Sequence, residues 1–190
     1  MKITPGTPSG EEIMKNLVFI NGTMGVGKSA TCKELLSLLS PSAFLDGDWC
    51  WSMSPFVVNE ETKAMVLGNA AYVLNSFLHC SAYRYVIFCW VMHEFSIVEE
   101  LLRRLDMSDV CFSLFTLTAS EEALSERLHK DMEEGKRSPD VLCRSLERLP
   151  LYAAMNSRKI DVSSMTPKEA AGRIAAFLTG RDAGVVSCVC

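Results

Sequence analysis

Residues Gly22 to Ser29 have the composition and spacing of a phosphate-binding loop. The stretch Gly-Thr-Met-Gly-Val-Gly-Lys-Ser matches the pattern G-x-x-x-x-G-K-[ST] in full. Its glycines leave the backbone N–H groups free to surround phosphate oxygens. Lys28 supplies a point charge for the outer phosphates, and Ser29 supplies a hydroxyl for Mg²⁺. We therefore expect nucleotide contacts along the loop and at the residue after it, that is, at Gly22, Thr23, Met24, Gly25, Val26, Gly27, Lys28, Ser29 and Ala30.

Two carboxylates with one residue between them follow the next apolar run. Asp46 and Asp48 come directly after the apolar residues 43–45 and flank Gly47. Phosphoryl transfer needs a carboxylate near Mg²⁺ and another near the acceptor hydroxyl, so this pair can supply both. Asp-Gly is also common in turns, but beside a phosphate-binding loop we favour the functional interpretation. The spacing does not indicate which aspartate acts as the base.

Three further side chains are candidates for contact with an acceptor, together with Asp48. Trp49 and Trp51 lie in a stretch rich in turn formers, where they can form an apolar wall for a ligand or pack the loop onto the sheet edge. The sequence favours neither interpretation. His93 follows a strongly apolar run and can position a substrate. Glu94 beside it is explained slightly better as the acidic start of a helix.

The apolar pattern predicts alternating strands and helices. Strands are expected at about 16–21, 43–45, 85–92, 110–117 and 159–162. Helices are expected from the phosphate-binding loop to 39 and at about 60–80, 94–105, 121–134, 140–149 and 166–178, with Pro150 ending the fifth of these six. Such alternation predicts an α/β fold with a parallel sheet between helices. The phosphate-binding loop, the pair Asp46 and Asp48, and the pair His93 and Glu94 each follow one of these strands. They therefore meet at the carboxyl ends of the strands, where ligands bind in such sheets.

Composition predicts one globular domain over residues 1–190. The chain is 48% hydrophobic with a net charge of −4, so we expect no nucleic-acid or membrane partner. It has eight cysteines and no C-x-x-C pair, which indicates reduced thiols in a cytoplasmic protein. Residues 1–12 lack the apolar core of a signal peptide and are expected to form a flexible leader. Residues 181–190, including Cys188-Val189-Cys190, are expected to be a frayed tail rather than a lipidation site.

The run Leu45-Asp46-Gly47-Asp48, about 24 residues after Gly22, resembles the second-strand motif of small P-loop metabolite kinases. Adenylylsulfate and gluconate kinases carry a similar L-D-G-D, and shikimate kinases carry a related D-x-D. The resemblance implies a three-layer αβα P-loop NTPase fold with strand order 2-3-1-4-5 and a helical lid at about 120–150. It also implies ATP and Mg²⁺ as cofactors, with Lys28 on phosphates, Ser29 and Asp46 on the metal, and Asp48 on the acceptor.

Basic residues are concentrated between 127 and 148, around Gly135, which is a plausible hinge. By the same resemblance, Arg127 and Arg137 fall where lid arginines lie, and they are candidate catalytic residues beside Lys28, Asp46 and Asp48. A solvated pair of amphipathic helices also explains the region, and Arg144 and Arg148 are left undecided between the two explanations.

The resulting expectation is an ATP-dependent kinase for a small-molecule hydroxyl or phosphate acceptor, acting as a monomer or homodimer. The alternative is a nucleotide-binding P-loop protein, an ATPase or regulatory ATP binder, without a small-molecule acceptor. GTPases and ABC-type ATPases are excluded because the motifs N-K-x-D, D-x-x-G and L-S-G-G-Q are missing.

Overall fold

A five-stranded parallel sheet forms the centre of the protein. The structure is a computed structural model that describes residues 14–180. The strands are β1 (Lys15–Asn21), β2 (Ser42–Asp46), β3 (Tyr85–Cys89), β4 (Val110–Thr118) and β5 (Arg158–Asp161). They pair in the order β2-β3-β1-β4-β5, and every pair is parallel. The predicted α/β class and the strand order 2-3-1-4-5 are therefore confirmed.

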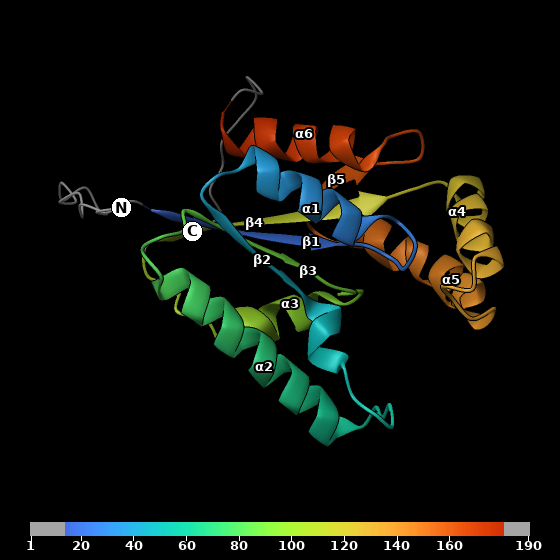
Figure 1. Ribbon diagram of the computed structural model, residues 1–190, viewed down its shortest axis with the longest axis horizontal. Coiled ribbons are helices and arrows are strands. Elements are labelled where there is room, and N and C mark those ends of the chain that lie inside the picture. Colours follow the sequence, from blue (N-terminus) through green and yellow to red (C-terminus); the bar gives the residue numbers. More distant parts are fainter. Residues whose placement is uncertain (1–13, 181–190) are drawn as a thin grey trace, which may run out of the picture.

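Helices cover both faces of this sheet. Helices α1 (Lys28–Leu38) and α6 (Pro167–Leu178) lie on one face, and α2 (Glu60–His79) and α3 (Phe95–Leu102) lie on the other (Figure 1). Helices α4 (Glu121–Glu133) and α5 (Asp140–Ala154) lie beyond the carboxyl ends of the strands (Figure 1). A short 3₁₀ helix, η1 (Gly47–Trp51), follows β2 directly. The two aspartates are thus fixed at the start of a regular element and not in an open loop.

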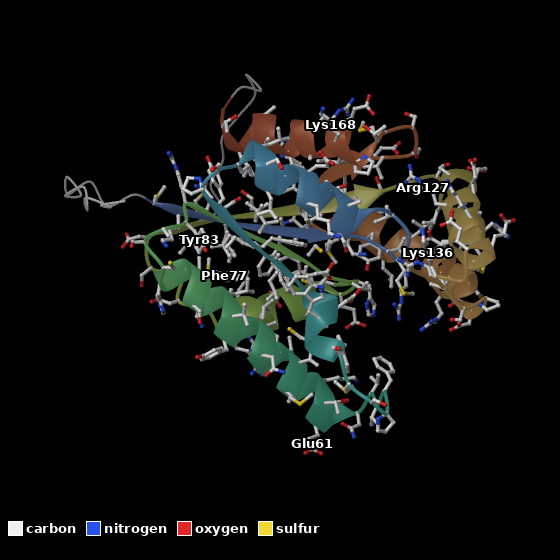
Figure 2. All side chains as sticks on the ribbon, in the orientation of Figure 1. Glu61, Phe77, Tyr83, Arg127, Lys136 and Lys168 are labelled. Carbon is white, nitrogen blue, oxygen red and sulfur yellow. The ribbon has the colours of Figure 1, made fainter. Side chains whose placement is uncertain are left out.

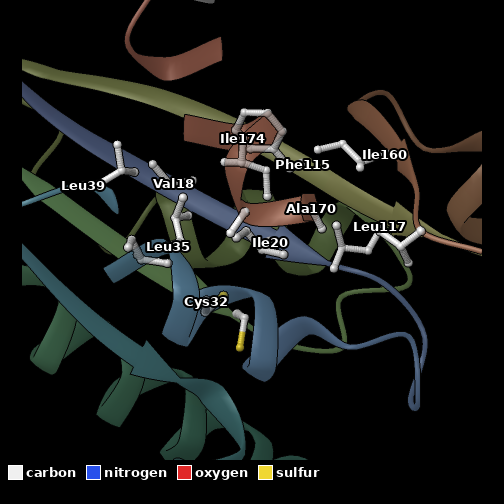
Figure 3. Close-up of a cluster of buried hydrophobic side chains, with 14 of the residues drawn as sticks. Val18, Ile20, Cys32, Leu35, Leu39, Phe115, Leu117, Ile160, Ala170 and Ile174 are labelled. Carbon is white, nitrogen blue, oxygen red and sulfur yellow. The ribbon is translucent and has the colours of Figure 1, made fainter. Parts of the chain in front are cut away.

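Alternating side chains of the central strand β1 enter two separate cores. Val18 and Ile20 pack with Leu35 of α1 and Ile174 of α6 (Figure 3). Leu17 and Phe19 point to the other face and pack with residues of α2 and α3. All of these side chains are fully buried, and each one contributes about 1.5–3 kcal/mol through burial. Burial on both faces explains why the strand is apolar throughout and not alternating.

Two predicted element ends are wrong. The strand expected at 85–92 ends at Cys89, which is the last residue that pairs with β2. Beyond it, the backbone N–H of Trp90 donates one more hydrogen bond, to the carbonyl oxygen of Ile20 in β1. The helix expected to stop at Pro150 runs on to Ala154. A proline inside a helix costs about 3 kcal/mol or more, since its ring meets the preceding turn and one N–H is lost. Tyr152 in the following turn is fully buried, so the apolar area of its ring offsets part of that cost, while its hydroxyl is buried without a hydrogen-bond partner.

Helices α4 and α5 meet around a small core of their own. Leu124, Leu128 and Val141 are buried there, and Met24 of the phosphate-binding loop packs against them. Within residues 14–180 no helix is both long and apolar enough to cross a membrane. Among the described residues, Cys32, Cys50, Cys80, Cys89 and Cys143 form no disulfide. The leader predicted at 1–12 and the tail at 181–190, with Cys188-Val189-Cys190, lie outside the described residues.

Candidate active site

The loop from Gly22 to Gly27 connects the buried end of β1 to the first turn of α1. Gly25 has a φ of 81°, and a Cβ atom there would lie 2.5 Å from the Leu128 side chain of α4. Gly27 has a φ of 102°, and a Cβ atom built on it meets no atom within 4 Å. The space above Gly27 is therefore open, next to the N–H groups at the start of α1. This open cradle fits a phosphate group.

Lys28 folds back over the loop that precedes it. Its ammonium donates hydrogen bonds of 2.9 Å to the carbonyl oxygens of Gly22 and Thr23. Desolvation lowers the pKa of Lys28, while the charges of Cys89, Asp48 and Asp46 oppose that shift. The ammonium group has lost part of its hydration on folding. An anionic phosphate would restore favourable interactions in place of the lost water, so the position suits a phosphate ligand.

Ser29 and Asp46 bring two oxygen ligands together across the ends of β1 and β2. The Ser29 hydroxyl donates to Asp46 Oδ2 at 2.5 Å, and Asp46 Oδ1 accepts from the Asp48 backbone N–H at 3.1 Å. No cluster of three or more His, Cys, Asp or Glu side chains suited to a metal occurs among residues 14–180. A hydroxyl and a carboxylate without such a cage fit Mg²⁺, which keeps several waters and takes remaining ligands from phosphates.

Asp48 lies one residue beyond this pair and has a different electrostatic environment. Desolvation and the negative charge of Asp46 raise the pKa of Asp48. The positive charges of Lys28 and Arg137 act in the opposite direction. Arg137 follows Gly135 in the α4–α5 connection, and its Nε donates to Asp131 at 3.0 Å. Its charge also lowers the pKa of Lys28, so this predicted lid arginine lies within electrostatic reach of both groups.

Gly47 holds the two aspartates against the end of β3. A Cβ atom on Gly47 would lie 2.5–2.9 Å from three atoms of the Trp90 side chain, so only glycine allows this close approach. Trp90 is one of the site residues that the sequence analysis did not identify.

Gly47→Ala should therefore lower the free energy of unfolding by about 1–3 kcal/mol, because Trp90 or the turn must move. Urea unfolding followed by circular dichroism measures this. Gly68→Ala is the matched control, since a Cβ atom there meets nothing within 4 Å and helix α2 should gain about 0.5–1 kcal/mol. Equal unfolding midpoints for the two variants would contradict the packing role of Gly47.

A cavity of about 660 Å³ opens beside Asp48, a volume typical of small-molecule sites. Its lining comes from the phosphate-binding loop, η1, the 52–58 segment, α2, the segment after β3, α3 and α5. Its lining residues are Met24, Asp48, Trp51, Phe56, Val58, Lys63, Leu67, Trp90, Val91, His93, Ile97 and Arg148. Three of the four residues predicted to bind the acceptor therefore line the same cavity, namely Asp48, Trp51 and His93.

The fourth predicted residue, Trp49, lies elsewhere. Its side chain is 66% exposed, and its ring centroid lies 6.5 Å from that of Phe44, away from the lining of the cavity. Trp51 lies 5.8 Å from the ring of Phe56. In a 3₁₀ helix, with three residues per turn, positions two apart point in different directions, which separates the two tryptophans.

A second, smaller hollow of about 140 Å³ lies on the other side of the phosphate-binding loop. Val26, Gly27 and Thr31 form one wall, and residues 162–170 form the other. Arg127 closes it: its guanidinium donates to the carbonyls of Val26 at 3.5 Å and Ser163 at 3.1 Å. Figure 2 shows Arg127 and Lys136 at the end of the molecule formed by α4 and α5. Arg127 thus contacts backbone carbonyls beside this hollow, apart from Asp46 and Asp48.

Comparison with known proteins identifies the family. The family model AAA_18, described as an AAA domain, matches residues 18–147, which include the phosphate-binding loop and both aspartates. The chain belongs to this AAA domain family. No curated protein sequence matches it.

Solved structures of similar fold include two kinases and a resistance protein. The tunicamycin resistance protein of Deinococcus radiodurans is 21% identical with a TM-score of 0.62, covering 86% of this chain and 95% of that one. A gluconokinase from Sinorhizobium meliloti 1021 is 18% identical with a TM-score of 0.60, covering 90% and 99%. Shikimate kinase from Acinetobacter baumannii, in complex with shikimate, is 19% identical with a TM-score of 0.60, covering 91% and 97%. The AAA domain therefore has the P-loop kinase fold that the sequence resemblance implied.

Eight lining residues of the cavity in this AAA domain are ones that the sequence did not identify as site residues, namely Phe56, Val58, Lys63, Leu67, Trp90, Val91, Ile97 and Arg148. Trp90 falls inside the strand predicted at 85–92, and the local sequence around Phe56 and Lys63 contains no binding motif. Arg148 was undecided, and the structure places it in the cavity wall, whereas Arg144 pairs with Asp140 at 2.6 Å. The exposed apolar run 56–58 was a signal in the sequence that could have pointed to Phe56.

Proposed function

We propose that the protein is a phosphotransferase that moves the γ-phosphoryl group of ATP to a hydroxyl of a small molecule. The observation that carries this proposal is the position of Asp48. Only Gly47 separates Asp48 from Asp46, which bonds Ser29. Asp48 also lies on the wall of a cavity that is separate from the phosphate cradle. A site with a nucleotide side, a carboxylate and an acceptor-sized cavity is what transfer requires. The neighbours of similar fold include a gluconokinase and a shikimate kinase, which agrees with a hydroxyl acceptor.

The nucleotide half of the proposed site is built mainly from backbone. The N–H groups of residues 22–30 bind the phosphates, and Lys28 turns from its own loop carbonyls to the outer phosphate oxygens. The hollow beside Arg127 receives the base, against Val26 and Pro167. Arg137 lies close enough to Lys28 and Asp48 to act on both, and it neutralises negative charge that develops on the transferred group.

The acceptor half depends on Asp48. Its carboxylate accepts the proton of the acceptor hydroxyl as the oxygen approaches phosphorus. Ser29 and Asp46 are the residues that would hold Mg²⁺, which when bound offsets phosphate charge. Asp46 also fixes the Asp48 backbone by accepting from its N–H, so the base is oriented by the metal-side carboxylate.

An acceptor-stimulated assay of ADP release tests this proposal. ADP formed from ATP and Mg²⁺ is measured by a coupled enzyme assay across a panel of hydroxyl compounds, and binding of ATP is measured separately by calorimetry. We expect at least one acceptor to raise turnover well above the rate with water. Tight ATP binding with no stimulation by any acceptor would instead support the alternative of a nucleotide-binding P-loop protein without a small-molecule acceptor.

Arg127→Ala should raise the KM for ATP about 10-fold while leaving kcat within about twofold, because it loosens the base hollow but not the phosphate cradle. Steady-state kinetics with varied ATP measure this. Lys130→Ala is the matched control, since Lys130 is exposed on the same helix. A fall in kcat with an unchanged KM would show that Arg127 acts on the transferred phosphoryl group, as the sequence resemblance implied.

A further inference from the structure

The cavity beside Asp48 has a mainly apolar wall. Trp51 of η1, Phe56 of the following segment and Trp90 after β3 provide three aromatic rings. Aliphatic side chains from the 52–58 segment, α2, the segment after β3 and α3, together with Met24 of the phosphate-binding loop, complete the surface, namely Val58, Leu67, Val91, Ile97 and Met24. The polar side chains that reach the cavity are Asp48, Lys63, His93 and Arg148. A polyhydroxylated ligand would leave most of its hydroxyl groups without hydrogen-bond partners against such a wall, and each buried unpaired group is costly.

The rim of the cavity supports the same conclusion independently. Phe56, Val57 and Val58 are consecutive and are exposed by 67%, 40% and 54%. Three adjacent apolar side chains exposed at the mouth of a pocket are typical of a surface that a ligand covers. Phe56 and Val58 line the cavity, whereas Val57 does not, so the segment is oriented with alternate residues towards the inside.

The basic side chains that line the cavity differ in how far other groups neutralise them. Lys63 pairs with Glu60 at 2.8 Å, which partly neutralises it. Arg148 forms no ion pair with any residue in the 14–180 range. Burial and the positive charge of Arg148 lower the pKa of His93, so the imidazole adds little positive charge at neutral pH. One half-buried guanidinium is therefore available to a ligand, in addition to the carboxylate of Asp48.

We propose that the phosphoryl acceptor is an alcohol or phenol with an aromatic or fused-ring apolar body and a single anionic or strongly accepting group. This rests on the proposed function and names the acceptor class for the same site. The apolar body lies between Trp51, Phe56 and Trp90, and the polar group faces Arg148. The hydroxyl lies at Asp48: its oxygen forms the bond to the γ-phosphorus, the bond to the β–γ bridging oxygen breaks, ADP leaves, and the proton passes to Asp48.

Direct binding tests the class before any turnover is required. Calorimetry with the full chain, Mg²⁺ and a non-hydrolysable ATP analogue compares three probes: 6-(hydroxymethyl)-2-naphthoate, 2-naphthalenemethanol and galactonate. We expect the naphthoate to bind most tightly, the neutral naphthyl alcohol more weakly, and galactonate at least about 10-fold more weakly than the naphthoate. Tighter binding of galactonate, or no binding of either naphthyl probe, would overturn the proposed class.

Two matched pairs of variants assign the effect to residues. Trp51→Ala should weaken naphthoate binding about 10-fold or more, and Trp49→Ala, two positions away and outside the cavity lining, far less. Arg148→Met should abolish the advantage of the naphthoate over the neutral alcohol, and Arg144→Met, one helical turn earlier and paired with Asp140, should keep it. Equal effects within either pair would overturn the corresponding contact. Circular dichroism of each variant separates these losses from unfolding.

Turnover separates this inference from the proposed function. Phosphorylation of the naphthyl probes, seen by mass spectrometry, supports both. Binding of these probes without any transfer, to them or to other hydroxyl compounds, would keep the ligand class and contradict the kinase. Efficient transfer to galactonate but not to the naphthyl probes would keep the kinase and contradict the class.

Discussion

Lys28→Ala should lower kcat/KM for ATP by about 10²–10³-fold, the cost typical of removing one preorganised group that stabilises transition-state charge. In the structure the Lys28 ammonium lies over the loop, bonded to the carbonyls of Gly22 and Thr23. Desolvation lowers the pKa of Lys28, so a bound phosphate would meet an ammonium that folding has already stripped of part of its hydration. The coupled ADP assay measures the loss.

Lys33→Ala is the control for this substitution. Lys33 is exposed on the same helix, so its removal changes the net charge equally and should alter kcat/KM by less than about twofold. Nucleotide binding to Lys28→Ala should also weaken. A folded Lys28→Ala protein that turns over at the wild-type rate would contradict both the phosphate role of Lys28 and the proposed transfer.

Asp48→Asn should lower the rate of phosphoryl transfer by about 10²–10⁴-fold, the range for loss of a general base, and should leave ATP affinity nearly unchanged. Asparagine keeps the shape of the side chain and the backbone N–H that bonds Asp46, but it cannot accept the proton. Single-turnover kinetics measure the transfer, and calorimetry measures ATP binding. A folded Asp48→Asn protein that no longer binds ATP would contradict this assignment.

The pH dependence of the same variant gives a second readout. The pKa of Asp48 is raised above its ordinary value of 3.8, so transfer by the wild type should decline as the pH falls through the raised value. The asparagine variant should lack this decline.

The stability of the same variant gives a third readout. The raised pKa means that the folded protein disfavours the ionised carboxylate of Asp48, so its ionisation lowers the free energy of unfolding above pH 3.8. Asp48→Asn should therefore unfold at an equal or slightly higher temperature than the wild type at neutral pH. Asp109→Asn, the same change at the amino end of β4, should alter neither rate nor pH profile.

The nucleotide side of the site could be predicted from the sequence because it is local. Gly22 to Ser29 form one continuous loop, and their geometry depends on glycine backbone and on the strand and helix at either end. Asp46 and Asp48 were also placed correctly, since the carboxyl ends of neighbouring parallel strands must meet at one edge. The strand order followed from the resemblance, and the sheet has it.

The acceptor side could not be predicted to the same depth because it depends on tertiary contacts. Trp49 and Trp51 are the same residue type in the same segment, so the sequence does not distinguish them. The geometry of the 3₁₀ helix η1 determines that Trp51 lines the cavity and Trp49 does not. Trp90 becomes a site residue because Gly47, far away in the sequence, allows it to approach. Arg148 lines the cavity because α5 lies across from η1 and the segment after β3, and that arrangement depends on the packing of distant elements.

The contrast between a cradle made of main chain and a cavity made of side chains has a consequence for how such proteins diversify. A substitution at Trp51 or Phe56 changes the shape of the cavity without removing a single N–H group of the loop from Gly22 to Gly27. Under the proposed function, the choice of acceptor can therefore change through neutral and adaptive substitutions while the phosphate-binding loop is retained. A scaffold of this kind is a convenient starting point for laboratory evolution, and a library confined to positions 51, 56, 58, 67, 91 and 148 would sample new acceptors at little risk to the phosphate chemistry.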